Sequence, residues 1–286
     1  MKVCPDCGGL VTDEWRCSSC GWTVARIDGF PAFSPALAAG NEGFRSGYFS
    51  ELAKLEEKNF WFRGRNRLIL WALNRYFPEA SGFMEVGCGT GYVLSGIRKE
   101  FPEMKLWGSE IDASGLGFAA RRVGNTELIQ MDARAMPFRE EFDVIGAFDV
   151  LEHVEEDEAV LGQVHAALKP GGGVMLTVPQ HPFMWSQQDV AACHVRRYSR
   201  SELLGKLKRA GFRIQLATSF VSLLFPLMML SRLVTKQTPT DPMSELRLGR
   251  GTNALFESVM NIEARLIKMN IHPPFGGSLL TVARKP

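Results

Sequence analysis

Short apolar runs alternate with longer amphipathic segments from residue 82 to the end of the chain. Apolar runs of about four to eight residues predict buried strands, and apolar residues that recur with helical spacing predict helices. The predicted strands are 82–87, 104–111, 127–132, 142–149, 171–179, 212–219 and 277–285, and the predicted helices are 92–101, 114–123, 157–168 and 200–211. Because alternating strands and helices need crossover connections, the pattern predicts an α/β fold with a doubly wound, mostly parallel sheet.

The segments outside this alternating region divide the rest of the chain. Residues 48–77 have the apolar spacing of two helices, and a longer insertion at about 220–276 precedes the last strand and is predicted to be helical. The predicted domains are a cysteine module at 1–33, a linker with N-terminal helices at 34–78, and the sheet domain at 79–286.

Three glycines follow the first predicted strand as Gly87-x-Gly89-x-Gly91. A glycine turn between a strand and a helix is where doubly wound folds bind ligands, but the dinucleotide pattern is GxGxxG and the spacing differs here. Glu85 lies at the end of the same strand and would repel a pyrophosphate. The turn therefore favours a ligand with an ammonium and a sulfonium group.

Two more acidic residues follow the next two strands. Glu110 can accept hydrogen bonds from both hydroxyls of a ribose, and Asp132 can accept one from an adenine amino group. Each acid could instead be a helix N-cap or a solvated strand end. Three acids at successive strand ends after a glycine turn favour the binding interpretation.

The motifs "EVGCGTG", "GSEID", "MDARAMPF", "FDVIGAFDVLEHV" and "LKPGGGVMLTVP" together resemble those of class I S-adenosylmethionine-dependent methyltransferases, over roughly residues 80–218 and 278–285. The resemblance implies a Rossmann-like, seven-stranded sheet and S-adenosylmethionine as methyl donor. It also implies a cofactor site formed by Glu85, Gly87, Gly89 and Gly91 at the methionine end, Glu110 at the ribose, Asp132 and Ala133 at the adenine, and Asp149 and Leu151 at the reaction centre.

Four of the six cysteines form two close pairs near the N-terminus, Cys4-x-x-Cys7 and Cys17-x-x-Cys20. This spacing matches a tetrahedral zinc site, and four thiolates leave no open position, so the metal would be structural. Disulfides or a redox pair are the alternatives. The segment "CPDCGG…CSSCG…DGFPAF" resembles the zinc ribbon that precedes some bacterial methyltransferases, including certain rRNA guanine methyltransferases.

The segment "NFWFRGRNRLIL" resembles a helix of many small-molecule and sugar methyltransferases. The resemblance implies that Trp61, Phe62, Arg63 and Arg65 cap the cofactor. The alternative is an amphipathic helix that packs Trp61 into the core.

The sequence "DVLEHV" holds Asp149, Glu152 and His153 at positions i, i+3 and i+4, which one helical turn would place on one face. Some quinone-precursor O-methyltransferases resemble it with Glu-x-x-Glu-His and bind a divalent metal there. Relatives without a metal share the sequence, so a second metal and a structural or substrate-positioning role both stay open.

The long segment 179–199 follows the fifth predicted strand and contains two histidines. Loops at the carboxyl ends of strands form substrate sites, and His181 or His194 could be a general base near neutral pH. The alternative is a loop held by salt bridges, with Ser199 as the N-cap of the next helix.

Composition and charge bear on whether the protein binds nucleic acid or a membrane. The net charge of +2 does not suggest a general nucleic-acid binder, and the cysteine module has only Lys2, Arg16 and Arg26 as basic residues. Residues 214–231 carry no charge, so 220–234 is expected to be a lid over the core or a homodimer contact, with peripheral membrane contact as the alternative.

The leading hypothesis is therefore an enzyme that methylates a small-molecule, sugar or lipid-linked acceptor at oxygen. An RNA-modifying methyltransferase that docks RNA through the zinc ribbon and a non-catalytic binding protein with the same fold are the alternatives. The first apolar stretches are interrupted by Cys, Asp and Arg, unlike a signal peptide, so a cytoplasmic protein is expected, with membrane association left open.

Overall fold

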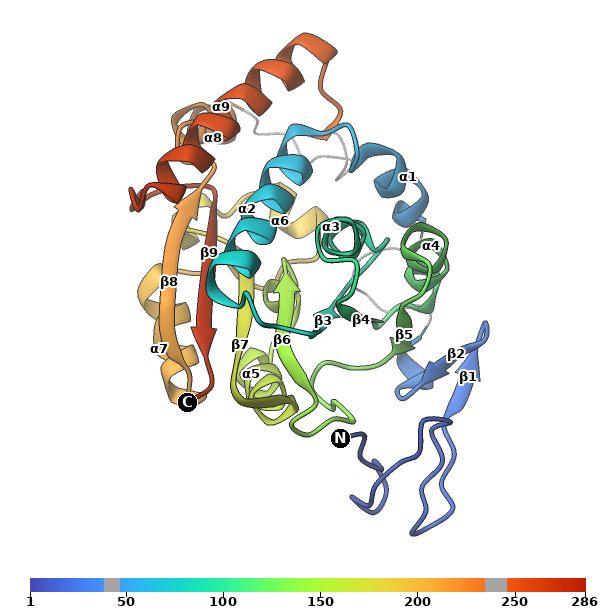
Figure 1. Ribbon diagram of the computed structural model, residues 1–286. Coiled ribbons are helices and arrows are strands. Elements are labelled where there is room, and N and C mark those ends of the chain that lie inside the picture. Colours follow the sequence, from blue (N-terminus) through green and yellow to red (C-terminus); the bar gives the residue numbers. More distant parts are fainter. Residues whose placement is uncertain (39–46, 235–245) are drawn as a thin grey trace.

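The structure is a computed structural model that describes residues 1–38, 47–234 and 246–286 (Figure 1). Parts of two predicted segments, 39–46 of the segment 34–78 and 235–245 of the insertion, lie outside the described residues.

Within the described residues, nine strands form one sheet in the order β1-β2-β5-β4-β3-β6-β7-β9-β8. Seven of them are the strands that the apolar runs predict: β3 (Gly82–Val86), β4 (Lys105–Glu110), β5 (Glu127–Gln130), β6 (Phe142–Phe148), β7 (Leu168–Pro179), β8 (Arg213–Phe220) and β9 (Ser278–Arg284). The strands β5, β4, β3, β6 and β7 are parallel, whereas β9 pairs antiparallel with both β7 and β8. The predicted α/β fold with a mostly parallel, seven-stranded sheet is confirmed.

Helices cover both faces of this sheet (Figure 1). One face carries α2 (Phe60–Tyr76), α3 (Tyr92–Glu100), α4 (Ala113–Val123) and α9 (Arg250–Lys268), and the other carries α5 (Asp157–Ala167) and α7 (Arg200–Arg209). Successive strand residues point to opposite faces, so Phe83 joins the first set of helices and Met84 the second. Both side chains are fully buried.

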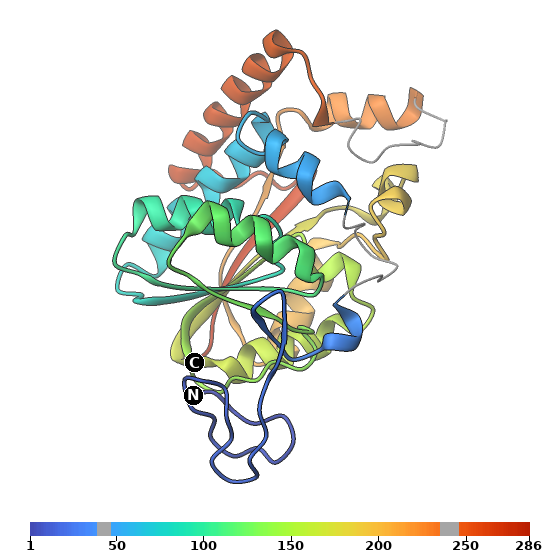
Figure 2. The same ribbon diagram turned by 90° about the vertical axis from the view of Figure 1, so that its right-hand side faces the viewer.

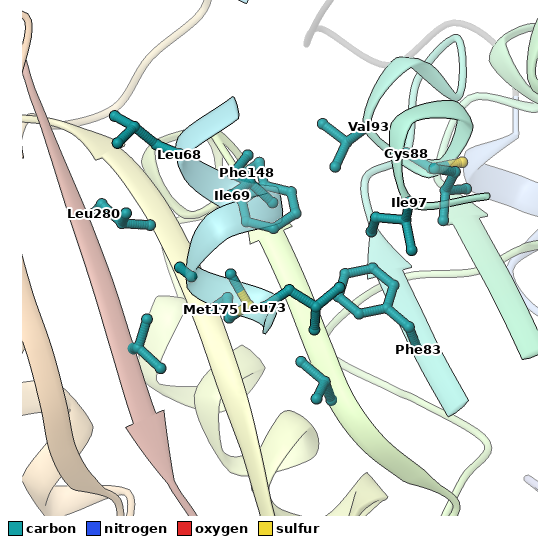
Figure 3. Close-up of a cluster of buried hydrophobic side chains, with 14 of the residues drawn as sticks. Leu68, Ile69, Leu73, Phe83, Cys88, Val93, Ile97, Phe148, Met175 and Leu280 are labelled. Atoms are coloured by element: carbon teal, nitrogen blue, oxygen red, sulfur yellow. The ribbon is translucent and has the colours of Figure 1, made fainter. Parts of the chain in front are cut away.

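The larger apolar cluster lies between the sheet and the helices of the first face (Figure 3). Leu68, Ile69 and Leu73 of α2 recur with helical spacing and pack towards Phe83 and Met175 on the strands. The helix begins where the side chain of Asn59 accepts a hydrogen bond from the backbone N–H of Trp61, at 2.8 Å. This packing fixes the N-terminal turn of α2 above the carboxyl ends of the strands.

The N-terminal module contributes the remaining strands. The hairpin of β1 (Ala25–Ile27) and β2 (Phe30–Ala32) extends the sheet, since β2 pairs with β5 through Ala32 and Gln130 (Figure 2). Trp15 is only 3% exposed and packs edge-on against Phe33 and Phe138. The module is thus packed onto the edge of the sheet, through β2 and through Trp15. Its predicted boundary at residue 33 remains a prediction.

The insertion before the last strand is helical where the structure describes it, in α8 (Phe225–Val234) and α9. Short helices complete the fold: α1 (Tyr48–Leu55) before α2, α6 (Gln187–Ala191) after β7, and the 3-10 turns η1 (Pro35–Leu37), η2 (Leu151–His153) and η3 (Pro182–Met184). Among the described helices, none combines the length and apolar character needed to cross a membrane.

Candidate active site

A cavity of about 1350 Å³ opens at the carboxyl ends of β3, β4, β5 and β6. Its walls come from the glycine turn after β3, from α1 and α2, from the loop after β7, and from α8. Single-ligand pockets commonly measure about 300–1,000 Å³, so this cavity has room for a cofactor and a second molecule side by side.

The glycine turn forms one wall of the cavity. Gly87, Gly89 and Gly91 have φ angles of +68°, +51° and +76°, which residues with a side chain rarely adopt. A Cβ at Gly87 would lie 2.5 Å from Val150, and one at Gly91 would lie 3.0 Å from Ala119. At Gly89 the nearest atom is 3.8 Å away, on Phe49, so the backbone of Gly89 is open to a ligand. Gly91 does not line the cavity but is the N-cap of α3.

Glu110 ends β4 and faces the same turn. One carboxylate oxygen accepts a hydrogen bond of 2.9 Å from the backbone N–H of Gly89, and the other accepts one of 2.8 Å from Ile111. Burial raises the pKa of Glu110, and these hydrogen bonds oppose that effect. The carboxylate thus both fixes the glycine turn and lines the cavity.

Glu85 lies in the floor of the cavity and is 3% exposed. Its Oε2 atom has no hydrogen-bond partner among the described residues. Burial raises the pKa of Glu85 well above its usual range, against the smaller effect of the nearby Arg65 cation. A buried carboxylate oxygen without a partner is costly, so this position suits a ligand that brings a hydrogen-bond donor with positive charge.

The third acidic residue has a different environment from the one that the sequence suggests. Asp132 and Ala133 both line the cavity, but the Asp132 carboxylate accepts hydrogen bonds from the guanidinium and backbone N–H of Arg134, at 2.8–3.1 Å. Despite partial burial, this pairing lowers the pKa of Asp132. Arg134 thus uses most of the acceptor capacity that an adenine amino group would need.

The expected helical turn at "DVLEHV" is wrong in one respect. Asp149 has a φ of +58° and precedes the 3-10 turn of Leu151, so it does not share a helical face with Glu152 and His153. The Asp149 carboxylate instead pairs with Arg65 of α2 and accepts a hydrogen bond from Thr177 at 3.1 Å. Leu151 is buried in the second apolar cluster and does not line the cavity, whereas Asp149 does.

The start of α2 forms a lid over this part of the cavity. Trp61, Phe62 and Arg65 line it, and the Arg65 guanidinium lies 4.5 Å from the ring centre of Trp61. Arg63 does not line the cavity and pairs with Glu257 of α9 at 3.0 Å. The arrangement combines both interpretations of this segment, because α2 packs on the core and also presents residues to the cavity.

A buried polar network connects α1 to the glycine turn, and the sequence patterns did not reveal it. Glu56 accepts hydrogen bonds of 2.5 Å from the Thr90 hydroxyl and from Arg122 of α4. Arg122 also donates to the carbonyl of Ala53 at 2.8 Å. The one sequence signal was an acid, Glu56, within a segment predicted to be helical, which is too common to single out.

A second group of polar side chains lies at the other end of the cavity. Glu152, His153 and His194 each have a potential ligand atom within 4.8 Å of those of the other two. His194 Nδ1 lies 3.0 Å from Asp189, which also accepts a hydrogen bond of 2.6 Å from Arg197. Salt bridges thus hold the loop after β7, while the same loop brings His194 to the cavity.

His181 lies elsewhere in that loop. Its ring is stacked on that of Phe275 and tilted against those of Phe183 and Phe225, with centroids 5.0–5.7 Å apart, and it does not line the cavity. Burial lowers the pKa of His181, an effect to which the charge of Arg197 adds. Of the two candidate bases, only His194 is in contact with the cavity.

The four N-terminal cysteines converge as the zinc hypothesis requires. Their sulfur atoms lie within 4.8 Å of one another, and Cys4–Cys20 and Cys7–Cys17 are separated by 3.7 and 3.5 Å. A tetrahedral site with Zn–S bonds of about 2.3 Å has sulfur atoms about 3.8 Å apart. All four cysteines are free thiols, so the arrangement fits a metal and not a pair of disulfides.

Part of the chain is similar to known proteins. A probable S-adenosylmethionine-dependent methyltransferase from Mycolicibacterium smegmatis is 23% identical over 167 residues, which cover 56% of this chain and 62% of that protein. A dTDP-3-amino-3,4,6-trideoxy-alpha-D-glucopyranose N,N-dimethyltransferase from Streptomyces venezuelae is 30% identical over 43% of this chain and 53% of its own length. The matches thus span about three fifths or less of these two proteins.

The fold and a family model agree with these relatives. A chain from the solved complex between the Haloferax volcanii Trm112 methyltransferase activator and a methyltransferase aligns with a TM-score of 0.56 at 17% identity, over 84% of this chain and 95% of that one. The family model described as a methyltransferase domain matches residues 55–217, more than half of the chain. The protein therefore belongs to the methyltransferase domain family and has the class I S-adenosylmethionine-dependent methyltransferase fold.

Proposed function

We propose that this protein transfers a methyl group from S-adenosylmethionine to an oxygen of a small-molecule, sugar or lipid-linked acceptor. The observation that supports it best is the buried Oε2 atom of Glu85, which has no hydrogen-bond partner among the described residues, beside an open glycine turn. A cofactor with an ammonium group and a sulfonium group would supply the positively charged hydrogen-bond donor that this oxygen lacks.

The residues of the cavity fit the parts of the cofactor. Glu85 and the backbone at Gly87 and Gly89 would hold its methionine end, and Glu110 would accept hydrogen bonds from the ribose hydroxyls. Because Arg134 occupies the Asp132 carboxylate, we propose that Ala133 and the backbone next to it contact the adenine. Asp149 acts through its ion pair with Arg65, which holds the lid of α2 over the cavity.

S-adenosylmethionine supplies a methyl carbon that its sulfonium already activates for in-line displacement. The protein then contributes mainly position and exclusion of water, together with removal of a proton if the acceptor is a hydroxyl. His194 is the residue at the cavity wall suited to that task, because its Nδ1 faces the Asp189 carboxylate. His181 lies in an aromatic cluster and is not proposed to touch the acceptor.

The side of the cavity formed by α8 suggests an apolar acceptor. Leu224, Leu227 and Met228 line the cavity, and the neighbouring Leu223 and Leu230 are largely exposed. Phe183 and Trp185 add exposed aromatic surface on the loop after β7. Such apolar surface next to an active-site opening is typical of proteins that take a lipid-linked substrate or touch a membrane surface.

We also propose that Cys4, Cys7, Cys17 and Cys20 bind one structural zinc ion. Two matched turns support this, since the backbone N–H groups of Gly8 and Gly21 donate to the carbonyls of Cys4 and Cys17, at 2.9 and 3.1 Å. The metal would stabilise a module in which Trp15 and Ala32 are the buried apolar side chains other than cysteine.

The direct test is transfer of a labelled methyl group from S-adenosylmethionine into fractionated cell extract, with and without nuclease. The proposal predicts label in a nuclease-resistant fraction of small molecules or of lipids extractable into organic solvent. Label that nuclease removes would support the RNA-modifying alternative instead. Cofactor binding without any transfer would support a non-catalytic binding protein.

A further inference from the structure

The cluster of Glu152, His153 and His194 is not explained by the cofactor site. Glu152 is completely buried, and neither of its carboxylate oxygens has a hydrogen-bond partner in the part of the chain that the structure describes. Leaving both oxygens unpaired in the interior is costly, so the side chain is placed for a ligand. Because Glu152 is among the residues that line the cavity, a ligand in the cavity would lie next to it.

The two histidines next to Glu152 each have one ring nitrogen in use. His153 Nδ1 lies 3.3 Å from the backbone carbonyl of Cys193, and His194 Nδ1 lies 3.0 Å from the Asp189 carboxylate. A carbonyl and a carboxylate can only accept, so both Nδ1 atoms carry the hydrogen and both Nε2 atoms are lone-pair donors in the neutral rings. A carboxylate or carbonyl behind the histidine is the usual second contact of a metal-binding imidazole.

The backbone and the surrounding charges keep this cluster together. The N–H of Val195 donates to the carbonyl of Glu152 at 2.7 Å, which fixes the loop after β7 against η2. Of the acids nearby, Asp149 is paired with Arg65 and Asp189 with Arg197. Glu152 is thus the acid in this group without its own salt bridge among the described residues.

We propose that Glu152, His153 and His194 bind a divalent transition-metal ion of the zinc class at the acceptor end of the cavity. One carboxylate and two imidazoles are a ligand set that such ions accept, and three protein ligands leave coordination positions open. Their potential ligand atoms lie within 4.8 Å of one another, close enough to share one ion after small side-chain rotations. Asp149, which the sequence suggested as a ligand, is held by Arg65 and Thr177 instead.

This inference rests on the proposed function for its role, since an open metal site at this place would bind and orient an acceptor oxygen. His194 then acts on the acceptor as a metal ligand and not as a free base. The site itself is testable without any acceptor, because metal binding is measured on the protein alone.

The experiment is equilibrium dialysis of the full chain against Zn²⁺ with metal analysis, together with S-adenosylmethionine affinity as a test of folding. Wild type is expected to retain about two zinc ions per chain, one in the cysteine site and one here. Glu152→Gln and His194→Asn should each retain about one, and His165→Asn, which alters a histidine of α5 outside the cavity, should retain about two.

Two results would overturn the inference. One is a wild-type protein that retains a single zinc ion, and the other is a second ion that persists in both Glu152→Gln and His194→Asn. If a ligand variant loses cofactor binding as well, Glu152→Asp is the further test, and the inference fails unless it restores cofactor binding and the second ion. Failure of the wild type to bind S-adenosylmethionine would contradict the proposed function alone.

Discussion

At the scale of single residues, we propose that Glu85 selects a positively charged ligand for the cavity. Burial raises its pKa, so the empty site favours the protonated form, whereas a bound ammonium group favours the carboxylate. Binding of S-adenosylmethionine should therefore release a proton wherever the pH lies between the pKa of the bound and of the empty state. Across that window the affinity should rise with pH.

Glu85→Gln tests this linkage. The variant should weaken binding by about 1.5–3 kcal/mol, because a charge-assisted hydrogen bond becomes a neutral one. Calorimetry in two buffers with different ionisation enthalpies should show proton release for wild type and none for the variant. Equal proton release in both proteins would show that another group is linked to binding.

Glu110 accepts a hydrogen bond from the N–H of Gly89, and it is also the residue proposed to bind the ribose hydroxyls. Glu110→Ala should weaken S-adenosylmethionine by roughly 1–3 kcal/mol, measured by calorimetry. Glu79→Ala, at an exposed position before β3, is the control and should leave the affinity unchanged. Unchanged affinity in Glu110→Ala would remove Glu110 from the cofactor site.

At the scale of elements, the turn between β3 and α3 contains one glycine that packs against the fold and another that is open to the cavity. Gly87→Ala places a methyl group against Val150, whereas Gly89→Ala points it into the cavity. Both variants incur about 1–2 kcal/mol of left-handed backbone strain, and only Gly87→Ala adds about 1–3 kcal/mol of overpacking.

The pair should therefore differ in denaturant unfolding and in binding. Gly87→Ala is expected to lose more stability, and Gly89→Ala is expected to lose most of its cofactor affinity while remaining closer to wild type in stability. The reverse order of stability loss would contradict the packing at Val150.

The seven strands β3 to β9 and the α-helices between β3 and β8, apart from α6, followed from the sequence because burial imposes a period on each element. Phe83 and Met84 point to opposite faces, and Leu68, Ile69 and Leu73 recur on one side of α2, as such periods require. The acids at the strand ends lie at the cavity for the same reason.

Side-chain partners did not follow from the sequence. Arg65 and Asp149 are far apart in the chain, and so are Glu56 and Arg122, and only the tertiary fold brings each pair together. No residue pattern predicts the left-handed backbone of Asp149, and the helical turn expected there was therefore wrong. His194 lies near Glu152 because the backbone N–H of its neighbour Val195 donates to the carbonyl of Glu152, a contact that no spacing rule predicts.

At the scale of the whole molecule, the cysteine module is part of the sheet edge. Trp15 lies between Phe33 and Phe138, and the N-terminal residues bond to the segment 137–141. Cys17→Ser should remove one zinc ion and increase hydrogen exchange in residues 1–33 and around Phe138, with β3 and α3 still protected.

Ser18→Ala changes the neighbouring exposed residue and should leave metal content and exchange unchanged. Full protection of residues 1–33 in Cys17→Ser without zinc would show that apolar packing, and not the metal, holds the module. Since every residue proposed for the cofactor lies outside this module, S-adenosylmethionine affinity should change little.

The central claim is that the cavity beside Glu85 and the glycine turn binds S-adenosylmethionine. Equilibrium binding of labelled S-adenosylmethionine to the full chain tests it most directly, with Gly89→Ala and Glu79→Ala measured in parallel. We expect saturable binding of about one cofactor per chain, retained in Glu79→Ala and largely lost in Gly89→Ala. A folded wild-type protein without saturable binding, or binding that is equal in all three proteins, would contradict it.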